Sequence, residues 1–78
     1  MRWEEVVGIN IRRWRLERGL SQEDVAHRVG IDLSYFGQIE RGKRNPTIAV
    51  LGRIADALDT PLVQFLDSVP EAPSSSET

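Results

Sequence analysis

The sequence contains no cysteine and one histidine. Without cysteine there is no disulfide, thiol nucleophile or zinc–thiolate site, and one histidine cannot form a metal cage. We therefore expect no metal and no cofactor. No apolar run approaches the ~20 residues of a membrane span, and no charged-then-apolar segment with a cleavage site opens the chain. These absences predict a cytoplasmic protein that has no membrane partner.

The composition fits one small globular domain. The chain has 78 residues, of which 40% are hydrophobic and 28% are charged. So short a chain can bury only one core, and this balance of residues argues against general disorder. The exception is the end of the chain, where Pro70 to Thr78 reads PEAPSSSET. We predict a domain over residues 1–68 and a disordered, acidic and serine-rich tail over residues 69–78.

The net charge of −2 understates how basic parts of the chain are. Three of the twelve acidic residues lie in the last twelve positions, so residues 1–66 carry ten basic and nine acidic residues. The basic residues are also clustered, which keeps a polyanionic partner open. The clusters are Arg12, Arg13, Arg15 and Arg18, and then Arg41, Lys43 and Arg44.

Apolar residues recur at helical spacing, and no paired runs of alternating β-branched residues occur, so the pattern predicts an all-α domain. Five short helices are expected. Trp3, Val7, Ile11 and Trp14 form the buried stripe of the first, which ends at Gly19. The later helices have recognisable starts. These are the caps Ser21, Asp32 and Thr47, and for the fifth helix the pair Thr60 and Pro61.

The second and third predicted helices fit a helix-turn-helix. Counting from Gln22, the fifth residue must be small because the helices cross there, and it is Ala26. The ninth must tolerate a positive φ, and it is Gly30. Five further positions must be apolar to attach the pair to the domain. All five are, namely Val25, Val29, Ile31, Phe36 and Ile39.

The segments RGLSQEDVA, IERGKRNP and LGRIADAL extend this pattern. From Val7 to Leu66 the chain resembles the phage repressor/Cro-like (XRE) family of helix-turn-helix regulators. Its length and the stretch DLSYFGQIERGKRN are similar to the controller proteins of restriction-modification systems. The resemblance implies a compact lambda-repressor-like fold and a dimer that binds duplex DNA with its third helix in the major groove.

The third helix has a face suited to reading bases. If Phe36 and Ile39 are buried, Ser34, Gln38 and Arg41 lie on the opposite, polar face. Gln38 can bond an adenine bidentately, Ser34 can give or take one hydrogen bond, and Leu33 can touch a thymine methyl. The base contacts are therefore predicted at Leu33, Ser34 and Gln38, which the resemblance also aligns with base-contacting positions.

Groups beside this helix are expected to hold the DNA backbone. Gln22 lies in the first turn of the second helix, where a phosphate can bind. The other backbone contacts are predicted at the edges of the third helix, and Arg44 is left open between a phosphate and a base. They are Tyr35, Lys43, Arg44 and Asn45.

Two charged residues are expected to be structural instead. Arg15 falls near Ile11 on the helical wheel, and Glu40 lies nearer Phe36 than Ser34. We predict an Arg15–Glu40 ion pair behind the third helix, as the family pattern also suggests. Ser34, Asp32 and His27 make no catalytic triad, because they lie in two adjacent short helices without a buried base or oxyanion donors. The protein is predicted not to be an enzyme.

The favoured function is a homodimeric, sequence-specific transcription regulator that binds a two-half-site operator. Dimerisation is expected through the fifth helix, whose apolar side chains exceed what one short helix can turn inward. An antitoxin-type interaction module with autoregulatory DNA binding and a second protein partner is the main alternative, and an RNA-binding domain is a further one. The predicted dimer residues are Leu62, Val63, Phe65 and Leu66.

Overall fold

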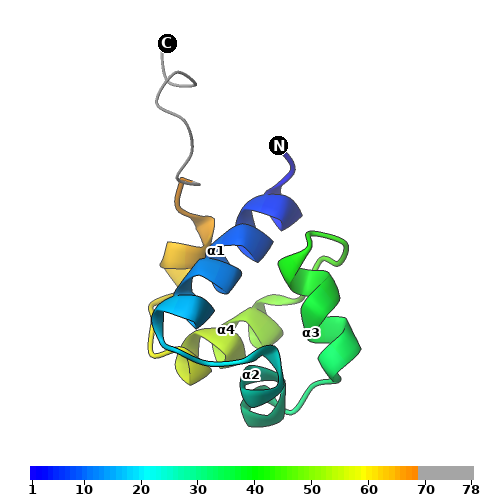
Figure 1. The fold of residues 1–78 in the computed structure, drawn as a ribbon. Helices are drawn as coiled ribbons and strands as arrows, with labels where there is room; N and C mark the ends of the chain where they lie inside the picture. Colours follow the sequence, from blue (N-terminus) through cyan, green and yellow to red (C-terminus); the bar gives the residue numbers. More distant parts are fainter. Residues whose placement is uncertain (69–78) are drawn as a thin grey trace.

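The computed structural model describes residues 1–68, which form four α-helices and a 3-10 segment (Figure 1). No strand occurs within these residues, so the all-α prediction is confirmed for the part described. The disordered tail predicted for residues 69–78 lies outside it. The elements are α1 (Trp3–Glu17), α2 (Gln22–Val29), α3 (Leu33–Glu40), α4 (Ile48–Ala57) and η1 (Leu62–Leu66).

The predicted fifth α-helix is the one element that differs in type. Residues Leu62–Leu66 form a 3-10 helix that begins after Pro61 and ends at Asp67, whose backbone is extended. Five residues are too few to offset the nucleation cost of an α-helix, whereas a 3-10 turn suits a short connector. The predicted count of five helices is therefore not confirmed: residues 1–68 form four α-helices and one 3-10 helix.

Local signals set the starts of three helices. The Ser21 side chain accepts a hydrogen bond from Asp24 N, and the Asp24 carboxylate accepts one from Ser21 N, which completes a capping box on α2. Asp32 and Thr47 cap α3 and α4 through their side-chain oxygens, without the reciprocal bond that completes a box. Gly30, with a φ of +82°, ends α2 in the left-handed conformation that glycine adopts without strain.

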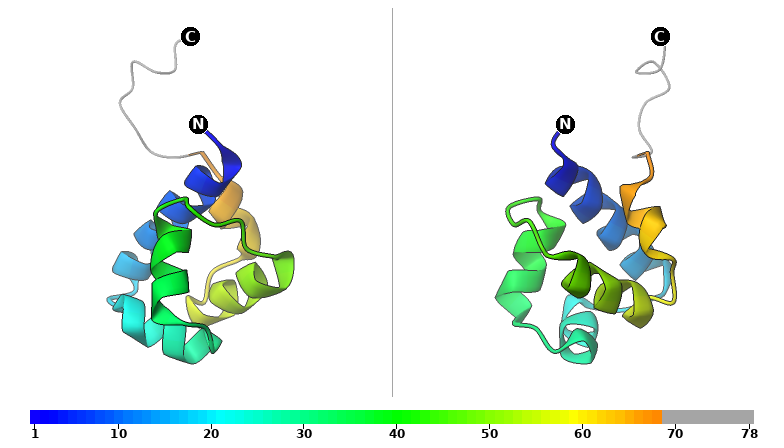
Figure 2. Two further views of the ribbon diagram at one scale, coloured as in Figure 1. Left: turned by 90° about the vertical axis from the view of Figure 1, so that its right-hand side faces the viewer. Right: turned by 180° about the vertical axis from the view of Figure 1, so that it is seen from behind.

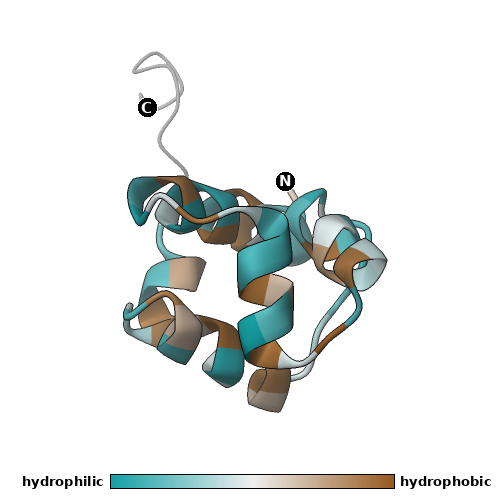
Figure 3. Cartoon of the chain, turned by 60° about the horizontal axis from the view of Figure 1, so that its bottom comes forward, coloured by the Kyte–Doolittle hydropathy of each residue, from teal (hydrophilic) through white to brown (hydrophobic). Residues whose placement is uncertain are grey.

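The helices surround a single core. α1 packs against α3 and η1, and α2 packs against α3 and α4. α2 lies at the end of the domain opposite the start of α1, as the two views in Figure 2 show. Hydrophobic residues form bands along the helices, with polar residues between them (Figure 3). The core consists of Val7, Ile11, Val25, Ala26, Val29, Phe36, Ile39, Leu51, Ile54, Ala55, Leu58 and Phe65.

The stripe predicted for α1 holds only in its middle. Val7 and Ile11 are buried and Trp14 packs partly against the core, but Trp3 is 67% exposed. Trp3 is the first residue of α1, and it lies at the rim of a shallow groove instead of under another helix. The prediction that it joins the buried stripe was wrong.

No helix among residues 1–68 combines the length and the apolar character that crossing a bilayer requires.

Candidate nucleic-acid interface

α2 and α3 form the helix-turn-helix that the spacing predicts. Ala26 is buried where the helices cross, and Gly30 makes the turn with a positive φ. Val25, Phe36 and the other apolar positions of the unit are buried, except that Ile31 is half-buried. The pair is thereby fixed to the core, and the other side of α3 faces solvent.

The solvent face of α3 is polar and shallow. Leu33, Ser34 and Arg41 are exposed and Gln38 is half-buried, while Phe36 and Ile39 on the opposite side are fully buried. The Asp32 side chain accepts hydrogen bonds from Ser34 N at 2.9 Å and Tyr35 N at 3.3 Å. The first turn of α3 is therefore capped, and the side chains that follow it project from a hydrogen-bonded backbone.

At the edge of α3 three side chains form a connected group. Arg44 Nε donates a hydrogen bond to Gln38 Oε1 at 2.8 Å, and Arg44 Cζ lies 5.3 Å from the centre of the Tyr35 ring. Such a distance permits a cation–π interaction. Sequence reasoning placed all three at the interface but missed their mutual contact, because the path of the loop after α3 decides it. Lys43 and Asn45 are exposed in the same loop.

This edge is electrostatically positive. Within residues 1–68 the ion pairs are Arg2 with Glu4 and Arg15 with Glu40, so neither Lys43 nor Arg44 is neutralised by a carboxylate there. Unpaired cations beside a polar helix face suit a phosphate backbone.

Behind α3 lies the predicted ion pair between Arg15 and Glu40. Arg15 Nε and Nη2 donate to the two carboxylate oxygens at 2.6 and 3.0 Å, and the two side chains are only 9% and 2% exposed. Arg15 Nη1 also donates to Leu20 O at 2.9 Å. The pair joins α1 to the end of α3 and to the turn before α2.

Gln22 makes a contact that sequence reasoning missed. Its Nε2 donates to Glu40 Oε1 at 2.9 Å, so Glu40 accepts from both Arg15 and Gln22. The amide nitrogen carries a second N–H, and the predicted phosphate contact at the start of α2 stays a prediction.

Two polar residues that sequence reasoning missed connect α1 to later parts of the chain. Asn10 is fully buried, and its Nδ2 donates to Phe65 O at 3.0 Å and Asp67 O at 2.8 Å. Arg18 donates to Leu58 O at 2.8 Å and Asp59 O at 2.9 Å, beyond the end of α4. An asparagine three residues after Val7, close to the buried stripe of α1, was the signal for the first. Nothing local marked Arg18 as different from its basic neighbours.

The four predicted dimer residues differ in how far they are exposed. Phe65 is fully buried and belongs to the monomer core, so its assignment to the dimer interface was wrong. Asn10 fixes the Phe65 carbonyl against α1, and the ring thereby enters the core. Leu62 is half-buried, whereas Val63 and Leu66 remain exposed.

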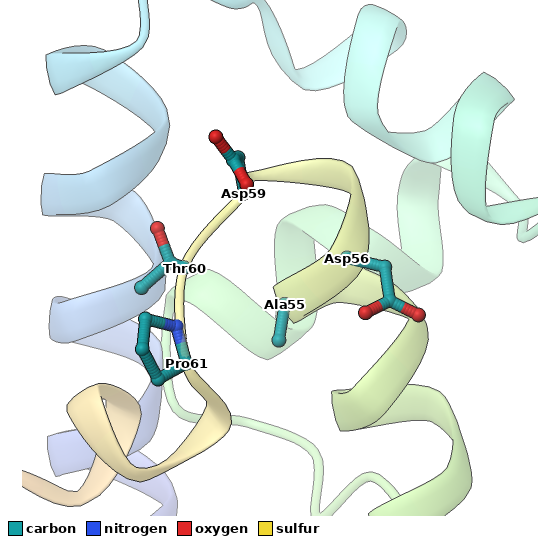
Figure 4. Close-up of a pocket in the computed structure, with 5 residues that line it drawn as sticks. All are labelled: Ala55, Asp56, Asp59, Thr60 and Pro61. Carbon is teal, nitrogen blue, oxygen red and sulfur yellow. The ribbon is translucent and has the colours of Figure 1, made fainter.

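A hollow of about 290 Å³ lies at the end of α4 (Figure 4). The carboxylates of Asp56 and Asp59 diverge in Figure 4 and do not meet over a common point. The Thr60 hydroxyl donates to Leu58 O and accepts from Arg18. Within residues 1–68 no three His, Cys, Asp or Glu side chains gather as a metal site would need. The side chains around this hollow therefore do not come together as a catalytic or metal-binding group.

The fold and the α2–α3 unit together define a helix-turn-helix transcription regulator. Residues 11–65 match the helix-turn-helix family HTH_3, and the chain belongs to that family. The resemblance to XRE-type regulators is thus confirmed.

Similar proteins cover nearly the whole domain. The uncharacterized HTH-type transcriptional regulator y4dJ of Sinorhizobium fredii is 40% identical over 73 residues, which are 94% of this chain and 95% of that protein. Control protein C.SmaI of Serratia marcescens is 36% identical over 81% of this chain and 75% of its own length. The crystal structure of the restriction-modification controller protein C.AhdI from Aeromonas hydrophila superposes with a TM-score of 0.77 at 37% identity, covering 80% of this chain and 94% of that one.

Proposed function

We propose that the protein binds a two-half-site operator in duplex DNA as a homodimer and thereby controls a promoter. Each subunit places α3 in the major groove. The observation that carries this proposal is the exposed polar face of α3, set on a capped first turn and followed by two cations without carboxylate partners among residues 1–68.

The proposed contacts follow from position and exposure. Leu33, Ser34 and Gln38 face the bases from α3. Lys43 and Asn45 contact the DNA backbone from the loop after α3. Tyr35 and Arg44 contact it from the edge of α3. At the start of α2 the backbone N–H groups and the remaining amide N–H of Gln22 bind a phosphate. The likeness to C.SmaI and C.AhdI supports a controller role, and a cytoplasmic location follows from the need to reach DNA.

The dimer interface is proposed around the exposed end of the domain. Val63 and Leu66 project from η1, and Trp3, Ile48 and Leu66 border a groove of about 400 Å³. Trp3, Ile48 and Leu66 are all exposed around this one groove, and apolar side chains exposed together often mark an interaction surface. A second copy would cover them in an isologous contact and set two α3 helices ~34 Å apart.

On the α3 face, the surroundings of Tyr35 favour duplex DNA over RNA. Single-stranded RNA is recognised largely by bases stacking on exposed aromatic rings. Tyr35 is half-buried, and the Arg44 guanidinium lies over its ring. That face is therefore not free as a stacking platform.

Selection of bound sites from random duplexes tests the proposal. We expect a motif with two symmetric half-sites, bound on the order of 10³-fold or more tightly than a shuffled duplex at the same salt concentration. Structured RNA of equal length, used as competitor, should release little of the bound duplex. Selection that returns no motif, or RNA that competes as well as the selected duplex, would contradict the proposal.

A further inference from the structure

We infer that Arg44 is a positioning residue that turns Gln38 from an adenine-reading side chain into a hydrogen-bond donor that favours guanine. The inference rests on the proposed function, since it concerns how the same α3 face chooses a base. Its starting point is the 2.8 Å hydrogen bond between Arg44 Nε and Gln38 Oε1.

The bond fixes which way the Gln38 amide is turned. A guanidinium can only donate, so the amide atom beside it is the carbonyl oxygen, not the nitrogen. Arg44 is itself held, because its guanidinium lies over the Tyr35 ring. Tyr35 and Gln38 are three residues apart on α3 and so share one side of the helix. In the protein without DNA, the amide oxygen therefore faces Arg44 and the amide nitrogen points away from it.

The fixed orientation changes what Gln38 offers to a base. A free glutamine pairs with adenine by accepting from N6 and donating to N7. Here the accepting oxygen is already occupied on one side by a cation, and the amino group of adenine would bring donor hydrogens toward that cation. Within residues 1–68 the Gln38 amide nitrogen makes no hydrogen bond, so its donors remain free.

Guanine fits this arrangement better. It presents two acceptors, N7 and O6, in the major groove. The Gln38 amide nitrogen can donate to one of them, and the positive Arg44 beside it is attracted to the same edge. Arg44 then influences sequence preference through Gln38.

The test is a comparison of Arg44→Ala with Lys43→Ala. Each removes one positive charge from the loop after α3, but only the Arg44 side chain is hydrogen-bonded to the Gln38 side chain. Lys43 bonds Gln38 through the backbone alone, from Lys43 N to Gln38 O at 2.9 Å, and alanine keeps that bond. Binding is measured on four duplex sets that differ only at the base pair whose preference Gln38→Ala abolishes. The wild type should prefer guanine there, and Arg44→Ala should shift the guanine-to-adenine ratio by about fivefold or more toward adenine. Lys43→Ala should lower affinity on all four sets alike.

A double variant shows whether the effect passes through Gln38. In a Gln38→Ala background, Arg44→Ala should change no base preference at that pair. A wild-type preference for adenine, an equal decrease in affinity for all four bases in Arg44→Ala, or a shift that persists without Gln38 would each overturn the inference.

A measurement without DNA separates this inference from the proposed function. The NMR signal of Arg44 Nε–H should move when Gln38 is replaced by alanine and stay in place in Lys43→Ala. An unmoved signal overturns the inference even if the protein binds its operator with full selectivity. A moved signal in a protein that selects no duplex leaves the hydrogen bond standing and overturns the DNA-reading role built upon it.

Discussion

Arg15 shows at the residue scale how a charge can serve the fold and not the ligand. It belongs to a cluster of four arginines in and just after α1, yet its guanidinium is buried against Glu40. Helical phase could predict this because burial in a helix follows the 3.6-residue repeat. The additional bond from Gln22 to Glu40 could not be predicted, because it depends on how closely α2 approaches the end of α3.

We predict that Arg15→Ala costs about 3 kcal/mol of unfolding free energy, because it leaves the Glu40 carboxylate buried with too few donors. Chemical denaturation measures this cost. Arg12→Ala, an exposed neighbour on the same helix, is the control and should change stability little. If Arg15→Ala weakened DNA binding while stability stayed at the wild-type value, Arg15 would be a phosphate contact.

Two glycines provide a second residue-scale prediction. A Cβ added to Gly8 would lie 2.6 Å from the carbonyl oxygen of Glu40 and closer still to that of Ile39, whereas one added to Gly52 meets nothing within 4 Å. Gly8→Ala should therefore destabilise the domain by roughly 1 to 3 kcal/mol, because α1 must move away from α3. Gly52→Ala should stabilise it by up to ~1 kcal/mol through helix propensity. Thermal unfolding of both variants should show midpoints that move in opposite directions; equal shifts would mean that α1 and α3 do not approach so closely.

At the scale of elements, local chemistry determines most of the helix boundaries. Ser21, Asp32 and Thr47 could be recognised as caps because a cap bonds to a backbone two or three residues away. The inward turn of Phe65 could not, because its carbonyl is held by Asn10, which lies 55 residues earlier in the chain. The 3-10 form of η1 follows from the shortness of the segment, which its start signal does not reveal. Trp3 could not be placed either, because its exposure depends on where α4 begins and η1 ends.

The capping box of α2 predicts a pH dependence. The backbone N–H of Ser21, and then its hydroxyl, hold the pKa of Asp24 below its usual value of 3.8. A carboxyl group with a lowered pKa in the folded state stabilises that state above the unfolded pKa, and this contribution disappears as the pH falls from about 4 through the folded value.

Asp24→Asn should therefore lose less stability than the wild type between pH 7 and pH 3. Glu23→Gln is the matched control, because Glu23 is also in the first turn of α2 but its side chain makes no hydrogen bond within residues 1–68. The measurement is the thermal unfolding midpoint of each variant and of the wild type at the two pH values. Identical pH profiles for Asp24→Asn and the wild type would show that the box does not persist in solution.

At the scale of the whole molecule, the exposed apolar end predicts the oligomeric contact. Leu66→Glu and Ile48→Glu should each raise the dimer dissociation constant by about tenfold or more while leaving the monomer folded, because both side chains are exposed in the single chain. Phe65→Glu should unfold the domain instead, since its ring is fully buried. Analytical ultracentrifugation combined with circular dichroism distinguishes the two results. Dimers as tight as wild type from both surface variants would place the interface elsewhere.

Reading the bases and holding the backbone should also be separable at this scale. Gln38 projects from α3, whereas Lys43 lies in the loop beyond it. Removing a side chain that bonds a base alters the choice among sequences. Removing one that bonds a phosphate alters affinity on every sequence together with its salt dependence.

The most direct test of α3 as the reading element is the binding of Gln38→Ala and Lys43→Ala to the selected operator and its single-base variants over a series of salt concentrations. Gln38→Ala should cost ~1 to 3 kcal/mol on the preferred site, relax the choice at one base pair in each half-site and keep the salt slope. Lys43→Ala should weaken binding equally on all sequences and lower the slope by ~1 for each phosphate that is no longer neutralised, or about twice that in a symmetric dimer. If Gln38→Ala kept both the affinity and the sequence preference of the wild type, α3 would not be the element that reads the DNA.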